Sequence, residues 1–101
     1  MSKNKALKVV KVYAKKLRES NFPFASVYLF GSFAKGKAGV DSDIDVAIVS
    51  DKLKKFENSF LLRRVRRQVD LRIEPHSFTK KSFSDDSNPL VSEIKKYGIL
   101  V

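Results

Sequence analysis

The chain has 101 residues, which is enough for one small domain with a modest core and leaves no room for a second lobe. Its 21 Lys and Arg residues outnumber 11 Asp and Glu, and the net charge of +10 favours polyanionic partners such as nucleic acid, nucleotides or an acidic protein surface. A hydrophobic content of 43% excludes a disordered chain, the lack of cysteine excludes disulfides and thiolate metal sites, and no apolar run suits a membrane span or a secretory signal.

We expect one cytoplasmic domain over residues 1–101, and its first element is an amphipathic helix over residues 4–20. Apolar residues of this helix recur at spacings of three and four, while lysine and arginine side chains recur on another face. A proline soon after the last turn ends the helix. The apolar stripe consists of Leu7, Val10, Ala14 and Leu17.

Two strands separated by a glycine-rich loop come next. Residues 26–30 are predicted to form a buried strand, which Gly31 ends. Residues 31–42 contain three of the four glycines and are predicted to form a loop. Residues 43–49 are predicted to form the second strand, in which side chains alternate between two faces. One face carries Ile44, Val46 and Ile48, and the other carries Asp43, Asp45 and Ala47.

A second helix is predicted over residues 53–68. Four arginines cluster over residues 63–67, near its end, where cations suit the helix dipole. The simplest interpretation of this cluster is a solvated helix face, and the alternative is a contact with RNA or an acidic protein. The residues expected to face inward are Phe56, Phe60, Leu61 and Val65.

The last third of the chain is predicted to hold a strand and a helix. Residues 69–74 alternate in polarity and are predicted to form a third strand that ends at Pro75. Residues 88–97 are predicted to form a short helix with Gly98 as its C-cap, followed by an apolar tail. Because His76 follows the predicted strand and a proline, we expect it to have a surface or capping role.

Two aspartates at the start of the second predicted strand carry the chemical signal. Residues i and i+2 of a strand share a face, so Asp43 and Asp45 present two carboxylates about 6–7 Å apart at Cβ. This separation suits two Mg²⁺ ions about 3.5–4 Å apart, the arrangement used for in-line displacement at phosphorus. Carboxylate oxygens are the ligands that Mg²⁺ prefers, so the pair predicts a metal site.

The Gly31-Ser32 pair at the end of the first predicted strand supplies the second half of the pattern. Glycine allows the backbone to come close to a phosphate, and the Ser32 hydroxyl and the following amides can donate hydrogen bonds to triphosphate oxygens. Lys35 and Lys37 lie in the same loop and offer cationic charge to the phosphates.

A third carboxylate is expected from the third predicted strand. We choose Asp70, which would complete the metal set and help to deprotonate an attacking hydroxyl. Glu74 is the competitor on the same strand face, roughly 13 Å further along the strand, so both cannot reach the same metals. Arg72 and Glu74 are otherwise interpreted as an exposed ion pair or as substrate-side residues.

These segments resemble the signature of a known superfamily. Residues 31–36, Gly-Ser-Phe-Ala-Lys-Gly, followed by residues 42–46, Ser-Asp-Ile-Asp-Val, closely resemble the motif of the DNA polymerase β-like nucleotidyltransferases. The short length and the segment over residues 89–100 resemble its minimal nucleotidyltransferase branch. The resemblance covers nearly the whole chain and implies an α+β fold, a mixed β-sheet backed by helices like the polymerase β-like palm.

The resemblance also implies an activity: Mg²⁺-dependent transfer of AMP from ATP, with release of pyrophosphate. In the family, the serine of the Gly-Ser pair binds the triphosphate and three acids bind two Mg²⁺ ions. Relatives often carry arginine where Lys35 stands, so a point charge replaces a bidentate fork here. The implied metal and catalytic residues are Asp43, Asp45 and Asp70, and the implied nucleotide-binding residues are Gly31, Ser32, Lys35 and Ser42.

The minimal branch is often paired with an HEPN-domain partner in toxin–antitoxin systems, where it acts as antitoxin by adenylylating a tyrosine of the toxin. By resemblance this is the leading biological role. The alternatives are a non-catalytic antitoxin-type module that neutralises a partner by covering it, and nucleotidyl transfer to RNA, which the net charge of +10 favours over a small cationic drug. A chain of this size forms one wall of a cleft, so a second subunit or a partner is expected to supply the acceptor side.

Overall fold

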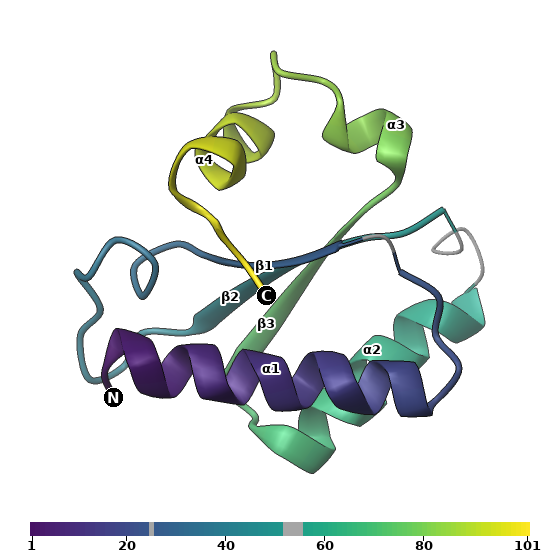
Figure 1. The fold of residues 1–101 in the computed structure, drawn as a ribbon, viewed down its shortest axis with the longest axis horizontal. Helices are drawn as coiled ribbons and strands as arrows, with labels where there is room; N and C mark the ends of the chain where they lie inside the picture. Colours follow the sequence, from purple (N-terminus) through teal and green to yellow (C-terminus); the bar gives the residue numbers. More distant parts are fainter. Residues whose placement is uncertain (25, 52–55) are drawn as a thin grey trace.

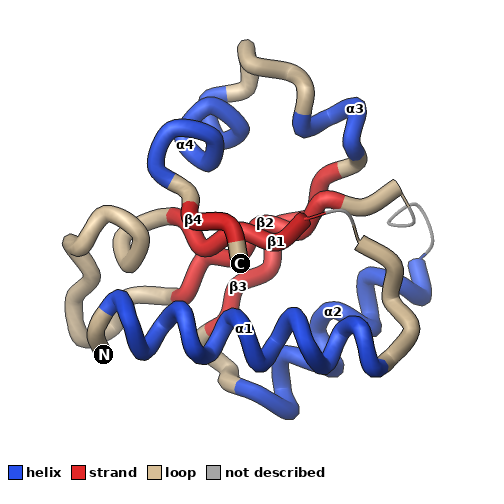
Figure 2. The backbone as a smooth tube through the Cα atoms, viewed as in Figure 1, coloured by secondary structure: helices blue, strands red, loops and turns tan. Residues whose placement is uncertain are grey.

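Four strands of the described part of the chain, residues 1–24, 26–51 and 56–101, form one mixed sheet in the computed structural model (Figures 1 and 2). The order is β3-β2-β1-β4, in which β1 pairs antiparallel with β2 and β4, and β2 pairs parallel with β3. The strands are β1 (Ser26–Phe30), β2 (Ile44–Val49), β3 (Ile73–Phe78) and β4 (Ile99–Leu100).

Helices cover both faces of this sheet, which confirms the expected α+β architecture. In Figure 1, α1 and α2 lie on one face, and α3 and α4 lie on the other. A larger core fills the space under α1 and α2, and a smaller one fills the space under α3 and α4. The helices are α1 (Lys3–Glu19), α2 (Phe56–Val69), α3 (Lys80–Phe83) and α4 (Pro89–Tyr97). None of the described helices combines the length and the apolar character needed to cross a membrane.

The first helix confirms the predicted amphipathic segment and begins one residue earlier. The side chain of Ser2 caps its N-terminus by accepting a hydrogen bond from the Lys5 amide at 3.2 Å. Its buried stripe also includes Tyr13, whose hydroxyl donates a 2.8 Å hydrogen bond to the carbonyl of Leu62 in α2. Burial raises the pKa of Tyr13, so the phenol stays protonated and keeps this tie between the two helices.

The second helix differs from its prediction in the residues that it buries. Phe60 was expected to face inward, but its side chain is 59% exposed, and Leu62 is buried instead. Val65 is buried as expected. The predicted start of the helix, residues 53–55, and the side chain of Phe56 lie outside the described residues.

The third strand is where the sequence prediction was wrong. The prediction placed a strand over residues 69–74 ending at Pro75, but α2 continues to Val69 and β3 runs from Ile73 to Phe78 through the proline. The Asp70 amide still donates to the Arg66 carbonyl at 2.9 Å, so Asp70 completes the helix rather than opening the strand. Because β3 is an edge strand, it tolerates a residue without a backbone N–H.

The C-terminal segment contains two elements that were not predicted. Thr79 caps the short helix α3 through a capping box with Ser82. Gly98 ends α4 as expected, with its amide donating to the Ile94 carbonyl at 2.7 Å, but its φ of −66° is not left-handed. The expected apolar tail then pairs with β1 as the strand β4.

We predict that Tyr13→Phe lowers the free energy of unfolding by about 1 kcal/mol, because the buried bond to the Leu62 carbonyl is lost without a change in packing. Urea unfolding followed by circular dichroism measures this change. Tyr97→Phe is the matched control, since this side chain is 46% exposed, and it should change stability by less than about 0.5 kcal/mol. Equal stability of the two variants would contradict the assigned tie between α1 and α2.

Candidate active site

The end of β1 and the starts of β2 and β3 lie side by side at one end of the strands. The candidate site residues lie at this end of the sheet. The C-terminal end of β1 lies beside the N-terminal end of β2, with Phe30 opposite Asp45. The parallel pairing of β2 with β3 places Glu74 beside Asp45. Since paired residues project to the same face of a sheet, Asp45 and Glu74 present neighbouring carboxylates.

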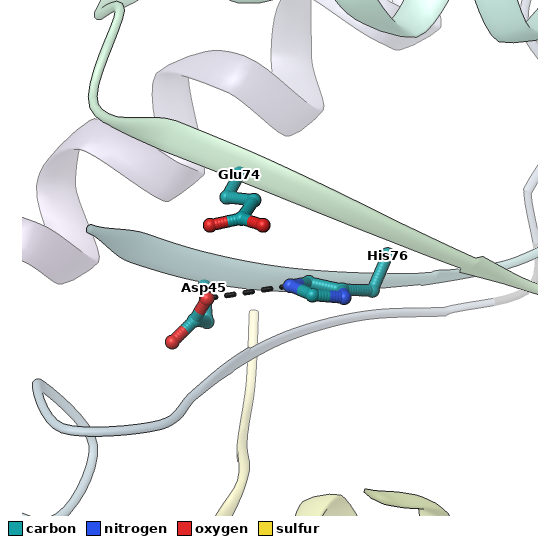
Figure 3. A group of neighbouring side chains, drawn as sticks. All are labelled: Asp45, Glu74 and His76. Atoms are coloured by element: carbon teal, nitrogen blue, oxygen red, sulfur yellow. Dashed lines mark hydrogen bonds and ion pairs between the residues drawn. The ribbon is translucent and has the colours of Figure 1, made fainter.

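His76 joins these two acids. Figure 3 shows Asp45 on β2 near Glu74 and His76 on β3. One ligand atom from each of the three residues lies within 4.8 Å of the other two, a group that could hold a metal ion. Asp45 and His76 are half-buried, whereas Glu74 is exposed. The group is therefore partly buried on the side of Asp45 and His76 and open to solvent on the side of Glu74.

The position of His76 corrects the expected surface or capping role. Its Nε2 lies 3.3 Å from Asp45 Oδ1, and its ring packs edge-on against Phe30, with centroids 5.1 Å apart. The sequence contained a signal for this arrangement, because Glu74 and His76 are two residues apart, as Asp43 and Asp45 are. This signal was missed because the predicted strand ended at Pro75, before His76.

The electrostatics of Asp45 reflect this crowded position. Burial raises the pKa of Asp45 above its ordinary value, and the hydrogen bond and charge of His76 oppose that rise. The negative charges of Asp43 and Glu93 raise the pKa of Asp45 further. Asp43 itself is exposed just before β2. A cation would therefore be favoured here, because it would relieve the repulsion among these carboxylates.

Asp70, the predicted third carboxylate, lies outside this group among the described residues. It occupies the turn between α2 and β3 and binds Arg72 in a bidentate manner, with Nε–Oδ1 at 3.0 Å and Nη2–Oδ2 at 2.7 Å. This hydrogen-bonded pairing lowers the pKa of Asp70. The expected exposed ion pair of Arg72 is thus made with Asp70, and Glu74 is the acid brought beside Asp45.

The loop after β1 approaches Asp45 closely at Gly31. Gly31 has a φ of +76°, and a Cβ atom added there would lie 2.2 Å from Asp45 Oδ2, so this position requires glycine for both reasons. The loop then turns back on itself, with the Lys37 amide donating to the Ser32 carbonyl at 2.9 Å. Buried Phe33 and Ala34 anchor the loop on the core.

Lys35 and Ser42, the other predicted nucleotide-binding residues, each have a partner within the protein. Lys35 Nζ pairs with Glu93 of α4 and lies 5.1 Å from the centroid of the Tyr97 ring. Ser42 accepts a 2.8 Å hydrogen bond from the Gly39 amide and closes the end of the loop. Within the described part of the chain, the amides of residues 32–34 donate no hydrogen bond, so they are available to an anion.

We predict that Gly31→Ala weakens binding of Mn²⁺, used as a metal probe, because its new Cβ would displace the Asp45 carboxylate. Gly36→Ala is the matched control: its φ is +71°, so the backbone strain is similar, but nothing lies within 4 Å of the added Cβ. Both substitutions should cost about 1–2 kcal/mol of stability. Paramagnetic broadening of NMR signals around Asp45 measures the affinity, and equal Mn²⁺ affinity in the two variants would contradict the close approach.

Solved structures that share this fold include toxin–antitoxin structures and a protein described as a nucleotidyltransferase. A toxin–antitoxin structure with AMP-PNP is 22% identical, with a TM-score of 0.62, over 99% of this chain and 72% of that one. A Sulfolobus solfataricus protein described as a nucleotidyltransferase is 21% identical, with a TM-score of 0.64, over 97% and 80% of the two chains. A mutant of the MntA–HpeT toxin–antitoxin is 19% identical, with a TM-score of 0.58, over 99% and 72%.

At these identities the solved structures establish the fold alone, and no curated protein matches the sequence significantly. The family follows from the sequence itself. The pattern of the nucleotidyltransferase domain matches residues 10–101, which include the loop after β1, Asp43 just before β2, Asp45 within β2 and the whole of β3. The chain therefore belongs to the nucleotidyltransferase domain family.

Proposed function

We propose that this protein transfers AMP from ATP to a hydroxyl group of a macromolecule in an Mg²⁺-dependent reaction, and that the acceptor is a tyrosine of a partner HEPN-type toxin. The observation that carries the proposal is the convergence of three strand ends. It places the Asp45 and Glu74 carboxylates together and sets Gly31 directly against Asp45. A phosphate-binding loop and a carboxylate group side by side are what phosphoryl chemistry requires.

The metal-binding part of the proposal involves Asp43, Asp45 and Glu74. Carboxylate oxygens suit Mg²⁺, and a cation would offset both the burial of Asp45 and the nearby negative charges that raise its pKa, so the residues present fit the metal. We assign the third carboxylate to Glu74 because it is the register neighbour of Asp45. When bound, two Mg²⁺ ions would neutralise charge on the triphosphate. His76 holds the Asp45 side chain in place through its 3.3 Å contact.

The nucleotide-binding part relies on the loop after β1. The amides of Ser32, Phe33 and Ala34 are available as donors, and successive backbone N–H groups form an anion-binding concavity. The Ser32 hydroxyl adds a donor to the same loop. Lys35 pairs with Glu93 of α4, so we assign it to positioning the loop against α4 rather than to direct phosphate contact. Ser42 is also assigned a positioning role, because its hydroxyl accepts a hydrogen bond from the Gly39 amide within the loop.

The proposed reaction is a substitution at the α-phosphorus. The acceptor oxygen forms a bond to the α-phosphorus, the bond to the bridging oxygen of the β-phosphate breaks, and pyrophosphate leaves. The hydroxyl proton passes to a carboxylate oxygen of Glu74, which is exposed and belongs to β3, the strand separated from β1 by β2. The protein contributes mainly position and charge, as is usual for phosphoryl transfer.

A partner protein is proposed for two reasons. Two of the structural neighbours are toxin–antitoxin structures, although their likeness to this chain extends to the fold alone. The acids also lie at an open edge, with Asp43 and Glu74 exposed, so another molecule must cover them to exclude water. An antitoxin role by adenylylation of the covering protein is consistent with both.

The test is a transfer assay with an HEPN-domain toxin as acceptor, ATP labelled at the α-phosphate, and mass spectrometry to locate AMP on tyrosine. We expect wild-type protein to transfer the label, and Asp43→Asn and Asp45→Asn to reduce the rate by more than about 100-fold with the fold intact. Full activity in both variants would exclude the proposed mechanism. Label from γ-phosphate-labelled ATP on the toxin would instead indicate phosphorylation.

A matched pair of variants in the same assay identifies the third carboxylate. Glu74→Gln should raise the Mg²⁺ concentration needed for half-maximal activity by at least about tenfold, because it removes a metal ligand. Asp70→Asn should leave this Mg²⁺ dependence unchanged, because Asp70 binds Arg72 instead. The reverse result would restore Asp70, the residue that the sequence favours.

A further inference from the structure

A cavity of about 380 Å³ opens beside the carboxylates, between the end of α2 and the start of β3. Its lining brings two of the proposed metal-binding acids together with three arginines. These are Asp43 and Glu74, together with Arg63, Arg66 and Arg72. The sequence favoured a solvated face for the arginines of α2, but two of them, Arg63 and Arg66, line a cavity beside the candidate active site.

The place of this cavity in the sheet relates it to the reaction. The loop after β1 and the strand β3 lie on opposite sides of β2, because the strand order is β3-β2-β1. In an in-line displacement the attacking oxygen approaches opposite to the leaving group. With the triphosphate held by the loop, the acceptor enters from the side of β3, which is where the cavity lies.

The charges that line the cavity suit an anionic acceptor. Asp43 and Glu74 serve the metal and the proton transfer in the proposed reaction, and Asp70 pairs with Arg72, which leaves the charges of Arg63 and Arg66 in excess. Arg66 Nε is buried and donates no hydrogen bond within the described residues, so it lacks an acceptor. Arg72 is held at the rim by its two bonds to Asp70 and remains 48% exposed. Asp70 thereby positions an arginine rather than a metal.

We propose, resting on the proposed function, that this cavity binds a carboxylate of an acidic peptide segment that carries the acceptor hydroxyl. Arginine forks bind carboxylates in a bidentate manner. An aliphatic side chain, Leu71, lies 71% exposed in the same cavity, and arginine beside apolar groups is typical of protein interfaces. No aromatic ring is present among the described lining residues to stack a base, as single-stranded nucleic acid binding would favour.

The test measures binding of two labelled tyrosine peptides by fluorescence anisotropy. In one, the tyrosine is flanked by Asp and Glu; in the other, by Asn and Gln. The protein is loaded with Mg²⁺ and an ATP analogue that has a methylene bridge between the α- and β-phosphorus atoms. We expect the acidic peptide to bind at least about tenfold more tightly, and Arg63→Gln and Arg66→Gln each to remove most of this preference.

Arg64→Gln is the matched control, because Arg64 is exposed on the same helix, carries the same charge and lies outside this cavity. It should retain the preference for the acidic peptide. Equal affinity for the two peptides would overturn the proposal, as would an equal loss in Arg64→Gln and Arg66→Gln. Tighter binding of an RNA oligonucleotide of equal net charge would also overturn it, in favour of a nucleic acid acceptor.

A second arm keeps this result separate from the proposed function. Binding of the ATP analogue alone should be lost in Asp43→Asn and kept in Arg66→Gln. If wild-type protein bound no nucleotide, the proposed function would fail. The peptide preference can also be measured without nucleotide. Its loss in Arg66→Gln but not in Arg64→Gln would still support binding of an acidic peptide in the arginine cavity.

Discussion

The parallel register between β2 and β3 is the constraint on which the candidate site depends. It sets Glu74 beside Asp45, and it sets His76 beside Ala47, two residues further along each strand. A shift of one residue would turn Glu74 and His76 toward α1 and α2 and bring Ile73 and Pro75 to the site. The buried side chains of Ile44, Val46, Ile48 and Ile73 fix this register from the opposite face. The hydrophobic core under α1 and α2 therefore positions the carboxylates.

Close backbone packing completes the site from the side of β1. Gly31 lies so near Asp45 that a single added carbon would collide with the carboxylate, which restricts this position to glycine. The same contact places the proposed phosphate-binding loop and Asp45 within one small region. Arg72, held by Asp70, and the arginines of α2 lie on the other side of β2. The proposed roles thus follow the strand order: triphosphate on one side, carboxylates in the middle and acceptor on the other.

The sequence predicted the first two strands and the first helix because these segments combine local periodicity with clear glycine or proline signals. It also predicted the mixed sheet with helices, through the resemblance of residues 31–36 and 42–46 to a known signature. The third strand was misplaced because a proline normally ends a strand, and only the edge position of β3 explains why Pro75 lies within it. This error favoured Asp70 over Glu74 and left His76 without an assigned partner. Burial of Leu62 instead of Phe60 likewise depends on how α2 rotates against α1, which local periodicity does not determine.

The loop after β1 and the carboxylates of Asp43, Asp45 and Glu74 are proposed to form one nucleotide site. Calorimetric titration of ATP into the pure protein, with and without Mg²⁺, beside the Asp43→Asn/Asp45→Asn double variant, tests it most directly. We expect binding that requires Mg²⁺ and is lost in the double variant. ATP binding that is equally strong without Mg²⁺, or that survives in the double variant, would contradict it.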